Sequence, residues 1–338
     1  MFKKIILLLL LFFLQIFTLK VYSQKKDLVY IRKVGFNKNE IRLENDTVVF
    51  LSSQIDNNVA KPIIVFLQGS MPIPLIYLKN GVAKTILPFD IEQYRDEFNF
   101  VLISRKGIPL VLEYEKHKTG FLDENGKSFL YYEKYNNLKY RTNQAKAVIE
   151  FLYNQPWVKK EAVFVVGHSE GYRVAAKLSE NNKIIKKLVC MSADPFNRTT
   201  EEIIKERILS FNHSSDSIFQ SNINVLLEDY KNIGNDIEKY NKNIELYNWM
   251  SYNSELAFES LKKFSNPILV VYGTDDVAAS AHGDLLPFLL RDNDLKINAY
   301  PDLDHNYFKK KYDKSGNLIE ESYHWDDVFK DVVNWLLF

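Results

Sequence analysis

The sequence predicts an α/β fold in which a mostly parallel eight-stranded sheet is flanked by helices and a helical cap is inserted after the sixth strand. Three observations support this fold class. Apolar runs of strand length alternate with helical patterns from Asp27 onward, the strand signal stops between Asp194 and Pro267, and a glycine-flanked turn joins one apolar run directly to a helical pattern. Such alternation is typical of βαβ units, whose sheet is covered on both faces.

The strands are expected at β-branched and aromatic runs bounded by turn residues. In chain order these runs are residues 28–34, 47–53, 62–67, 100–104, 163–166, 187–191, 268–272 and 297–300. A helix is expected at about 143–154, where Ala147, Val148, Phe151 and Leu152 have helical spacing, and two hairpins are expected at 120–129 and 307–323 around turn residues.

Long helical patterns replace the strand signal after the sixth strand. They begin with a predicted capping box, in which Thr199 is the N-cap and Glu202 follows three residues later. We therefore expect a helical cap at 197–264 and a core made of 24–196 and 265–338. Loops at the carboxyl ends of parallel strands surround the functional site of such a sheet, so this cap is expected to roof the site and govern substrate choice.

The N-terminus has the pattern of a secretory signal peptide, predicted at residues 1–23. Lys3 and Lys4 precede an apolar run at 5–14, and the small Ser23 offers a cleavage point. Polar residues interrupt the apolar stretch before it reaches a membrane-spanning length, at Gln15, Thr18 and Lys20. We expect a periplasmic or secreted protein with no stable membrane insertion after cleavage; an uncleaved anchor is the alternative.

Charge and cysteine content exclude several classes of partner. Lys and Arg number 44 against 43 Asp and Glu, so the basic excess that drives nucleic-acid binding is absent, and no nucleic-acid partner is expected. Cys190 is the single cysteine and lies in an apolar run, so it is expected in the core and no intrachain disulfide can form. The sequence contains no metal-binding spacing and no glycine-rich phosphate loop, so neither a metal nor another cofactor is expected.

The most informative motif is Gly167-His168-Ser169-Glu170-Gly171, which directly follows the apolar run 162–166 and precedes a helical pattern. A strand, a sharp turn and a helix in this order form a nucleophile elbow, which raises the serine hydroxyl above the sheet. The flanking glycines suit a turn in which a Cβ would strike neighbouring backbone. Ser169 is therefore the predicted nucleophile.

A serine nucleophile needs a histidine to accept its proton and an acid to orient that histidine. Gly273-Thr274-Asp275-Asp276 ends the seventh predicted strand, and Leu303-Asp304-His305-Asn306 follows the eighth. Together with the elbow, these segments resemble the α/β-hydrolase superfamily of serine hydrolases. The resemblance covers nearly all of the chain after the signal peptide except the cap.

The resemblance implies an acid followed by a histidine, each on a loop after a later strand. It maps the acid onto Asp276, with Asp275 as the alternative, and restricts the base to His282, His305 or His324. His305 is favoured because His282 falls in a predicted helix and His324 opens the C-terminal one. His168 is expected to point away from the nucleophile, and His117 and His213 to lie on the surface or in the cap.

Acyl transfer also needs two N–H groups to stabilise the oxyanion. One is expected from Glu170, directly after the nucleophile, and the other from the loop 66–72, with Ser70 as the candidate and Met71 as the alternative. The side chain of Glu170 is expected either to contact a polar or cationic substrate group or to pair with Arg173 or Lys177 on its own helix.

The resulting hypothesis is an exported serine hydrolase that cleaves a small ester or amide through an acyl-enzyme. Its partner is a small-molecule or short peptide substrate, and an esterase is slightly favoured over a peptidase. Two alternatives remain, because a fold does not establish an activity. One is a binding protein that keeps the hydrolase scaffold without turnover, and the other is an acyltransferase that uses the same three residues.

Overall fold

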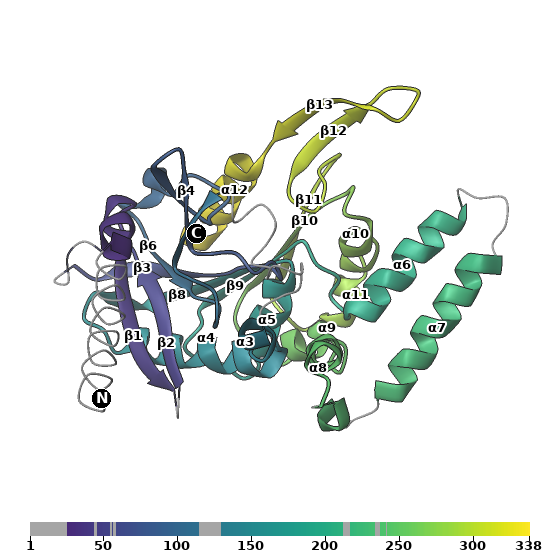
Figure 1. Cartoon of the computed structure of the whole chain (residues 1–338), viewed down its shortest axis with the longest axis horizontal. Helices are drawn as coiled ribbons and strands as arrows, with labels where there is room; N and C mark the ends of the chain where they lie inside the picture. Colours follow the sequence, from purple (N-terminus) through teal and green to yellow (C-terminus); the bar gives the residue numbers. More distant parts are fainter. Residues whose placement is uncertain are drawn as a thin grey trace, which may run out of the picture.

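The computed structural model describes residues 26–43, 46–54, 56, 59–114, 130–211, 217–233, 237–240 and 242–338. An eight-stranded sheet with the order β1-β2-β6-β3-β8-β9-β10-β11 runs through the molecule (Figure 1). Its pairs are parallel from β6 to β11, and β1 and β2 are antiparallel additions at one edge. The predicted α/β class and its mostly parallel sheet are confirmed. The strands are β1 (Asn37–Leu43), β2 (Asp46–Ser52), β3 (Lys61–Leu67), β6 (Asn99–Ile103), β8 (Val158–His168), β9 (Lys187–Met191), β10 (Ile268–Gly273) and β11 (Leu295–Tyr300).

The first predicted strand is wrong. Residues 26–33 form a helix, and β1 begins at Asn37. Ile31 is fully buried and Leu28 half-buried while Val29 is exposed, which is the spacing of a helix face rather than the alternation of a strand. The true β1 was missed because its sequence is mostly polar, as suits an exposed edge strand.

The sheet separates two apolar cores. Alternate residues of β3 face opposite sides: Ile63 and Val65 belong to one core, and Ile64 and Phe66 to the other. The first core includes side chains of α4 (Leu138–Tyr153) and α5 (Glu170–Ser179), and the second includes side chains of α12 (Trp325–Leu337). Cys190 is buried in the first core. Helices therefore cover both faces of the sheet, next to the loops that carry the site.

The segment between β9 and β10 is helical. It contains α6 (Arg198–Phe211), α7 (Ser217–Ile233), η2 (Ile237–Tyr240), α8 (Ile244–Ser251) and α9 (Ala257–Lys262). In Figure 1, α6 and α7 lie side by side and extend away from the sheet, whereas α8 and α9 lie against the body. Leu261 and Phe264 bury in the first core, so the end of this segment also stabilises the sheet.

The predicted cap residue of α6 is wrong. The helix begins at Arg198, and the Asn197 side chain accepts the Thr200 N–H at 2.9 Å. Thr199 bonds instead to Asn253, through both its N–H and its hydroxyl. Asparagine is as good an N-cap as threonine, so the sequence allowed the helix to begin after either Asn197 or Thr199.

The remaining elements lie around the sheet. The predicted hairpin at 307–323 is formed by β12 (Phe308–Tyr312) and β13 (Leu318–Tyr323), which extend from the body in Figure 1. The hairpin predicted at 120–129 and the signal peptide predicted at 1–23 lie outside the described residues. Among the residues described, no helix has the length and apolarity needed to span a membrane. The other elements are β4 (Ile76–Lys79), β5 (Val82–Thr85), η1 (Glu92–Tyr94), β7 (Val111–Glu113), α3 (Leu130–Glu133), α10 (Val277–Gly283) and α11 (Leu286–Leu289).

Candidate active site

The predicted elbow is a strained turn between β8 and α5. β8 ends at His168, α5 begins at Glu170, and Ser169 between them has φ 57° and ψ −124°. A Cβ on Gly167 would overlap the Gly171 carbonyl, and a Cβ on Gly171 would overlap the Leu67 carbonyl. Both glycines are therefore required for β3, the turn and α5 to approach this closely. The strain holds the Ser169 hydroxyl at the surface of the sheet's carboxyl edge.

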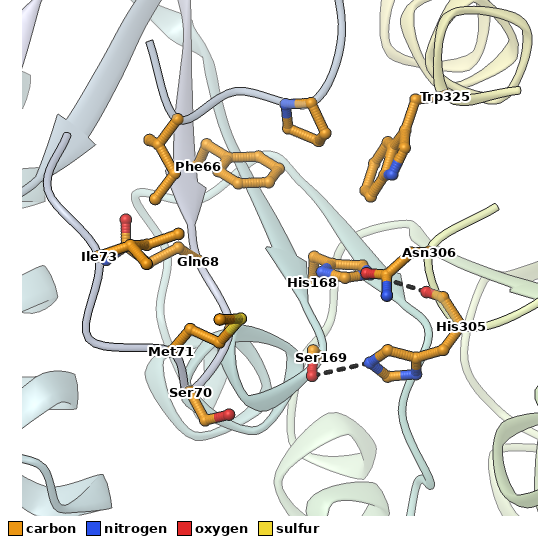
Figure 2. Close-up of a pocket in the computed structure, with 13 residues that line it drawn as sticks. Phe66, Gln68, Ser70, Met71, Ile73, His168, Ser169, His305, Asn306 and Trp325 are labelled. Carbon is orange, nitrogen blue, oxygen red and sulfur yellow. Dashed lines mark hydrogen bonds between the residues drawn. The ribbon is translucent and has the colours of Figure 1, made fainter. Parts of the chain in front are cut away.

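Three predicted residues from distant segments meet at this turn. His305 Nε2 lies 3.0 Å from Ser169 Oγ, and His305 Nδ1 lies 2.7 Å from Asp276 Oδ2. Asp276 follows β10 and His305 follows β11, so adjacent parallel strands deliver both residues to the same edge. Asp275 is exposed, and it is Asp276 that bonds to the histidine. Figure 2 shows the His305 ring directed at Ser169.

The Asp276 carboxylate controls the protonation of His305. Burial alone would lower the pKa of His305, but the hydrogen bond and negative charge of Asp276 outweigh it, and the pKa lies above its ordinary value of 6.5. In the neutral ring, Nδ1–H donates to Asp276 and leaves Nε2 free to accept the Ser169 proton. This arrangement is that of a general base next to a nucleophile.

The His168 ring lines the cavity and contacts His305 rather than the nucleophile. Its Nε2–H donates to the His305 carbonyl oxygen at 3.0 Å, and its ring packs edge-on against Trp325 with centroids 4.9 Å apart (Figure 2). Burial, with the nearby His305 ring, lowers the pKa of His168 to about 3, so the ring stays neutral and its single N–H lies on Nε2, where it donates to the His305 carbonyl. The sequence did not predict this contact, because nothing in the elbow motif indicates that the His168 ring bonds to the backbone of His305.

The Glu170 side chain does not pair with Arg173 or Lys177, and the alternative contact with a substrate group stays a prediction. It lies beneath the elbow, 2.6 Å from Arg141, and also pairs with Arg198. Arg173 pairs with Glu201, and Lys177 with Glu180 and Glu255. Burial alone would raise the pKa of Glu170, but the surrounding arginines lower it, so the carboxylate stays ionised. The predicted pairing within the helix is wrong because the start of α5 is buried, and the cations that contact Glu170 there come from other segments.

The loop after β3 passes beside the nucleophile. A Cβ on Gly69 would lie 3.2 Å from the Ser169 Cβ, and Ser70 and Met71 line the cavity next to it. Glu170 is the first residue of α5, so its N–H has no partner within the helix. Both segments predicted to supply the oxyanion donors therefore lie beside the nucleophile, and the donors themselves stay a prediction.

A cavity of about 350 Å³ opens beside Ser169 and His305. Most of its wall is apolar and comes from core segments rather than from α6 or α7 (Figure 2). The expectation that the inserted helices govern substrate choice therefore stays a prediction. The lining residues are Phe66, Gln68, Gly69, Ser70, Met71, Ile73, Ile86, Pro88, His168, Ser169, His305, Asn306 and Trp325.

The other candidate histidines lie elsewhere. His282 Nδ1 lies 2.6 Å from the buried Asp194, and His324, which precedes α12, bonds to Asp327. His117 and His213 lie outside the described residues. Within those residues no group of three or more His, Cys, Asp or Glu side chains could hold a metal ion.

The fold of this chain is similar to that of several solved structures. It resembles dipeptidyl peptidase 4 of Porphyromonas gingivalis, with a TM-score of 0.54 and 11% identity over 89% of this chain. It also resembles a putative dipeptidyl aminopeptidase IV of Bacteroides ovatus, with a TM-score of 0.54 and 12% identity over 89% of this chain. A third similar structure is that of a puromycin-hydrolyzing peptidase of Mycobacterium tuberculosis, with a TM-score of 0.50 and 12% identity over 80% of this chain. The chain spans only 35%, 35% and 36% of those proteins, so the likeness establishes the fold, which is the α/β-hydrolase fold.

A family comparison agrees with the fold. The family described as BAAT / Acyl-CoA thioester hydrolase C terminal matches residues 145–282, which include the elbow and Asp276. No curated protein matches the sequence. The chain thus has the α/β-hydrolase fold, and part of it is similar to a family of acyl-CoA thioester hydrolase domains.

Proposed function

We propose that this chain is an exported serine hydrolase that cleaves a small ester, thioester or amide through an acyl-enzyme. The observation that carries the proposal is the continuous hydrogen-bonded series from Ser169 through His305 to Asp276, with distances of 3.0 and 2.7 Å. The signal-peptide pattern at the N-terminus supports export.

In the proposed reaction Ser169 Oγ attacks the substrate carbonyl while His305 Nε2 takes its proton. Asp276 stabilises the imidazolium that forms, and the N–H groups of Glu170 and Ser70 bind the oxyanion. His305 then gives the proton to the leaving group, whose bond to the carbonyl carbon breaks. Water then gives a proton to His305 and attacks the acyl carbon; the bond from this carbon to Ser169 Oγ breaks, His305 returns the proton to Ser169, and the acid is released.

The cavity favours a compact apolar group on the substrate. At about 350 Å³ it is at the small end of ligand sites, and Phe66, Ile86 and Trp325 contribute apolar walls. A short acyl chain or a single aromatic ring fits such a space. The family match adds thioesters to the candidates, and the fold neighbours add N-terminal dipeptide amides.

The test is covalent labelling of the purified protein with a fluorophosphonate. Wild type should be labelled and hydrolyse at least one member of a panel of short-chain p-nitrophenyl esters, acyl thioesters and aminoacyl amides. Ser169→Ala should be neither labelled nor active, while a Ser280→Ala control behaves as wild type. Equal labelling of wild type and Ser169→Ala would overturn the assignment. A folded wild type that is neither labelled nor active would favour the binding-protein alternative, and product formation with an added alcohol would favour the acyltransferase.

A further inference from the structure

A buried group of charged side chains lies beneath the oxyanion loop, the segment Gln68 to Met71. Arg105 follows β6 and Arg141 belongs to α4, and both are about 5% exposed. Glu170 lies 2.6 Å from Arg141 and 3.6 Å from Arg105, and it is 2% exposed. Ion pairs this deeply buried contribute little net stability, because removing both charges from water offsets their attraction. Stability alone therefore does not explain why these charges are buried.

The donors of this group hold three consecutive carbonyl oxygens of the oxyanion loop. Arg141 Nη2 donates to the Gln68 oxygen at 2.7 Å, and Arg105 Nη1 donates to the Gly69 oxygen at 2.6 Å. The Tyr132 hydroxyl donates to the Ser70 oxygen at 2.8 Å and accepts from Arg105 Nη2 at 2.7 Å. Arg105 is thus bonded both to the loop and to the tyrosine that holds the next carbonyl.

These bonds fix the direction of three N–H groups. In a trans peptide the N–H points opposite to the C=O of the same peptide unit, and none of the described peptide bonds is cis. The carbonyls of residues 68 and 69 face the arginines and that of residue 70 faces Tyr132, so the N–H groups of Gly69, Ser70 and Met71 face away from these donors. Successive N–H groups that point the same way form an anion-binding concavity. Gly69 lies against Ser169, and Ser70 and Met71 line the cavity on this side.

We propose that Arg105 is a positioning residue that aims the Ser70 and Met71 N–H groups at the oxyanion formed on a substrate attacked by Ser169. The inference rests on the proposed function, since it concerns the same acyl-transfer site. Glu170 anchors the arginine through its charge, and its own N–H supplies the other donor. One residue therefore connects both halves of the oxyanion hole.

The same carboxylate connects this group to the inserted helices. Arg198, the first residue of α6, pairs with Glu170 and stacks on the rings of Trp249 and Tyr252, with its guanidinium 5.3 and 5.1 Å from their centroids. The start of the insertion is therefore tied to the side chain that anchors the oxyanion loop. A change in the position of α6 would reach the loop through Glu170.

The test is Arg105→Lys, which keeps the charge but loses the planar fork that bonds to two partners at once. We expect kcat for the best ester to fall about 10- to 100-fold, approaching the loss of one oxyanion donor, with KM within about twofold of wild type. Affinity for a trifluoromethyl ketone, which forms an oxyanion on Ser169, should fall by the same factor. Affinity for the corresponding alcohol, which forms none, should not change.

The matched control is Arg95→Lys. Arg95 also bonds to two loop carbonyls, those of Val34 and Gly35, and to a carboxylate, Glu92, but it lies near the start of β3, at the opposite edge of the sheet. It should leave kcat unchanged. Tyr132→Phe removes one hydroxyl and should reduce kcat several-fold, so the inference stays testable even if Arg105→Lys does not fold.

Three results would overturn the inference while fluorophosphonate labelling of wild type upholds the proposed function. The first is a wild-type kcat in folded Arg105→Lys or in Tyr132→Phe. The second is a lower kcat in these variants with unchanged affinity for the ketone. The third is a shift in the pH midpoint of their kcat/KM, which would place the effect on His305. Failure of the proposed function would appear differently, as a wild type that does not react with the probe.

Discussion

The depressed pKa of His168 predicts that this residue makes the fold sensitive to acid. Its pKa is about 3 in the folded chain, whereas an unfolded histidine titrates near 6.5. The contribution is fully present above pH 6.5 and is lost as the pH falls toward 3, because the unfolded chain binds the proton first. The loss should reach about 2 kcal/mol at pH 5 and about 5 kcal/mol below pH 3. Replacing His168 with glutamine, which keeps an N–H donor but cannot be protonated, should remove this term.

The assay is urea unfolding followed by fluorescence at about pH 7.5 and pH 5. Wild type should lose about 2 kcal/mol more stability between the two than His168→Gln, since the other titrating groups are common to both proteins and cancel. Parallel losses in wild type and His168→Gln would refute the reasoning.

Three further predictions concern the elbow and its partners. First, kcat/KM should fall as the pH drops through the pKa of His305, which lies above 6.5. Asp276→Asn should lower kcat about 10⁴-fold while Asp275→Asn has little effect, and similar losses in the two variants would contradict the geometry. Second, Gly171→Ala should destabilise the fold by several kcal/mol, as measured by urea unfolding, against about 1 kcal/mol for Gly316→Ala, which strains φ but meets no atom. Third, Ile86→Trp should raise KM for bulky esters more than for acetate esters, and an equal rise would place the substrate outside the cavity.

The parts of the fold that could be predicted are those in which burial dictates the residue types. Strands β3, β8, β9 and β10 are buried along most of their length, and so their sequences are apolar runs that only a covered sheet explains. β1 is polar and lies at an edge, where pairing with β2 rather than side-chain burial makes it a strand. The sequence therefore predicts a strand's existence best where both faces of the sheet are covered.

The site divides in a similar way. Ser169 could be predicted because backbone contacts require glycine on both sides of it, which leaves a motif in the sequence. Asp276 and His305 could be predicted only together with the elbow, since their order along the chain follows from the resemblance. Arg105 and Arg141 carry no local signal. Each is an ordinary basic residue in the sequence, and it is their burial beneath the loop that makes them noteworthy.

Position 170 shows why partners are harder to predict than positions. Along α5, Arg173 and Lys177 are the nearest cations in sequence, and an exposed helix would pair them with Glu170. The start of α5 is instead enclosed by β3, α4 and the insertion, and the cations that reach it come from Arg105, Arg141 and Arg198, 28 to 65 residues away in sequence. An unpaired carboxylate there would be costly to bury, so any chain with an acid directly after this nucleophile must supply cations from other segments. Because two of those cations, Arg105 and Arg141, also hold loop carbonyls, the same side chains help to neutralise one buried charge and to aim the oxyanion donors.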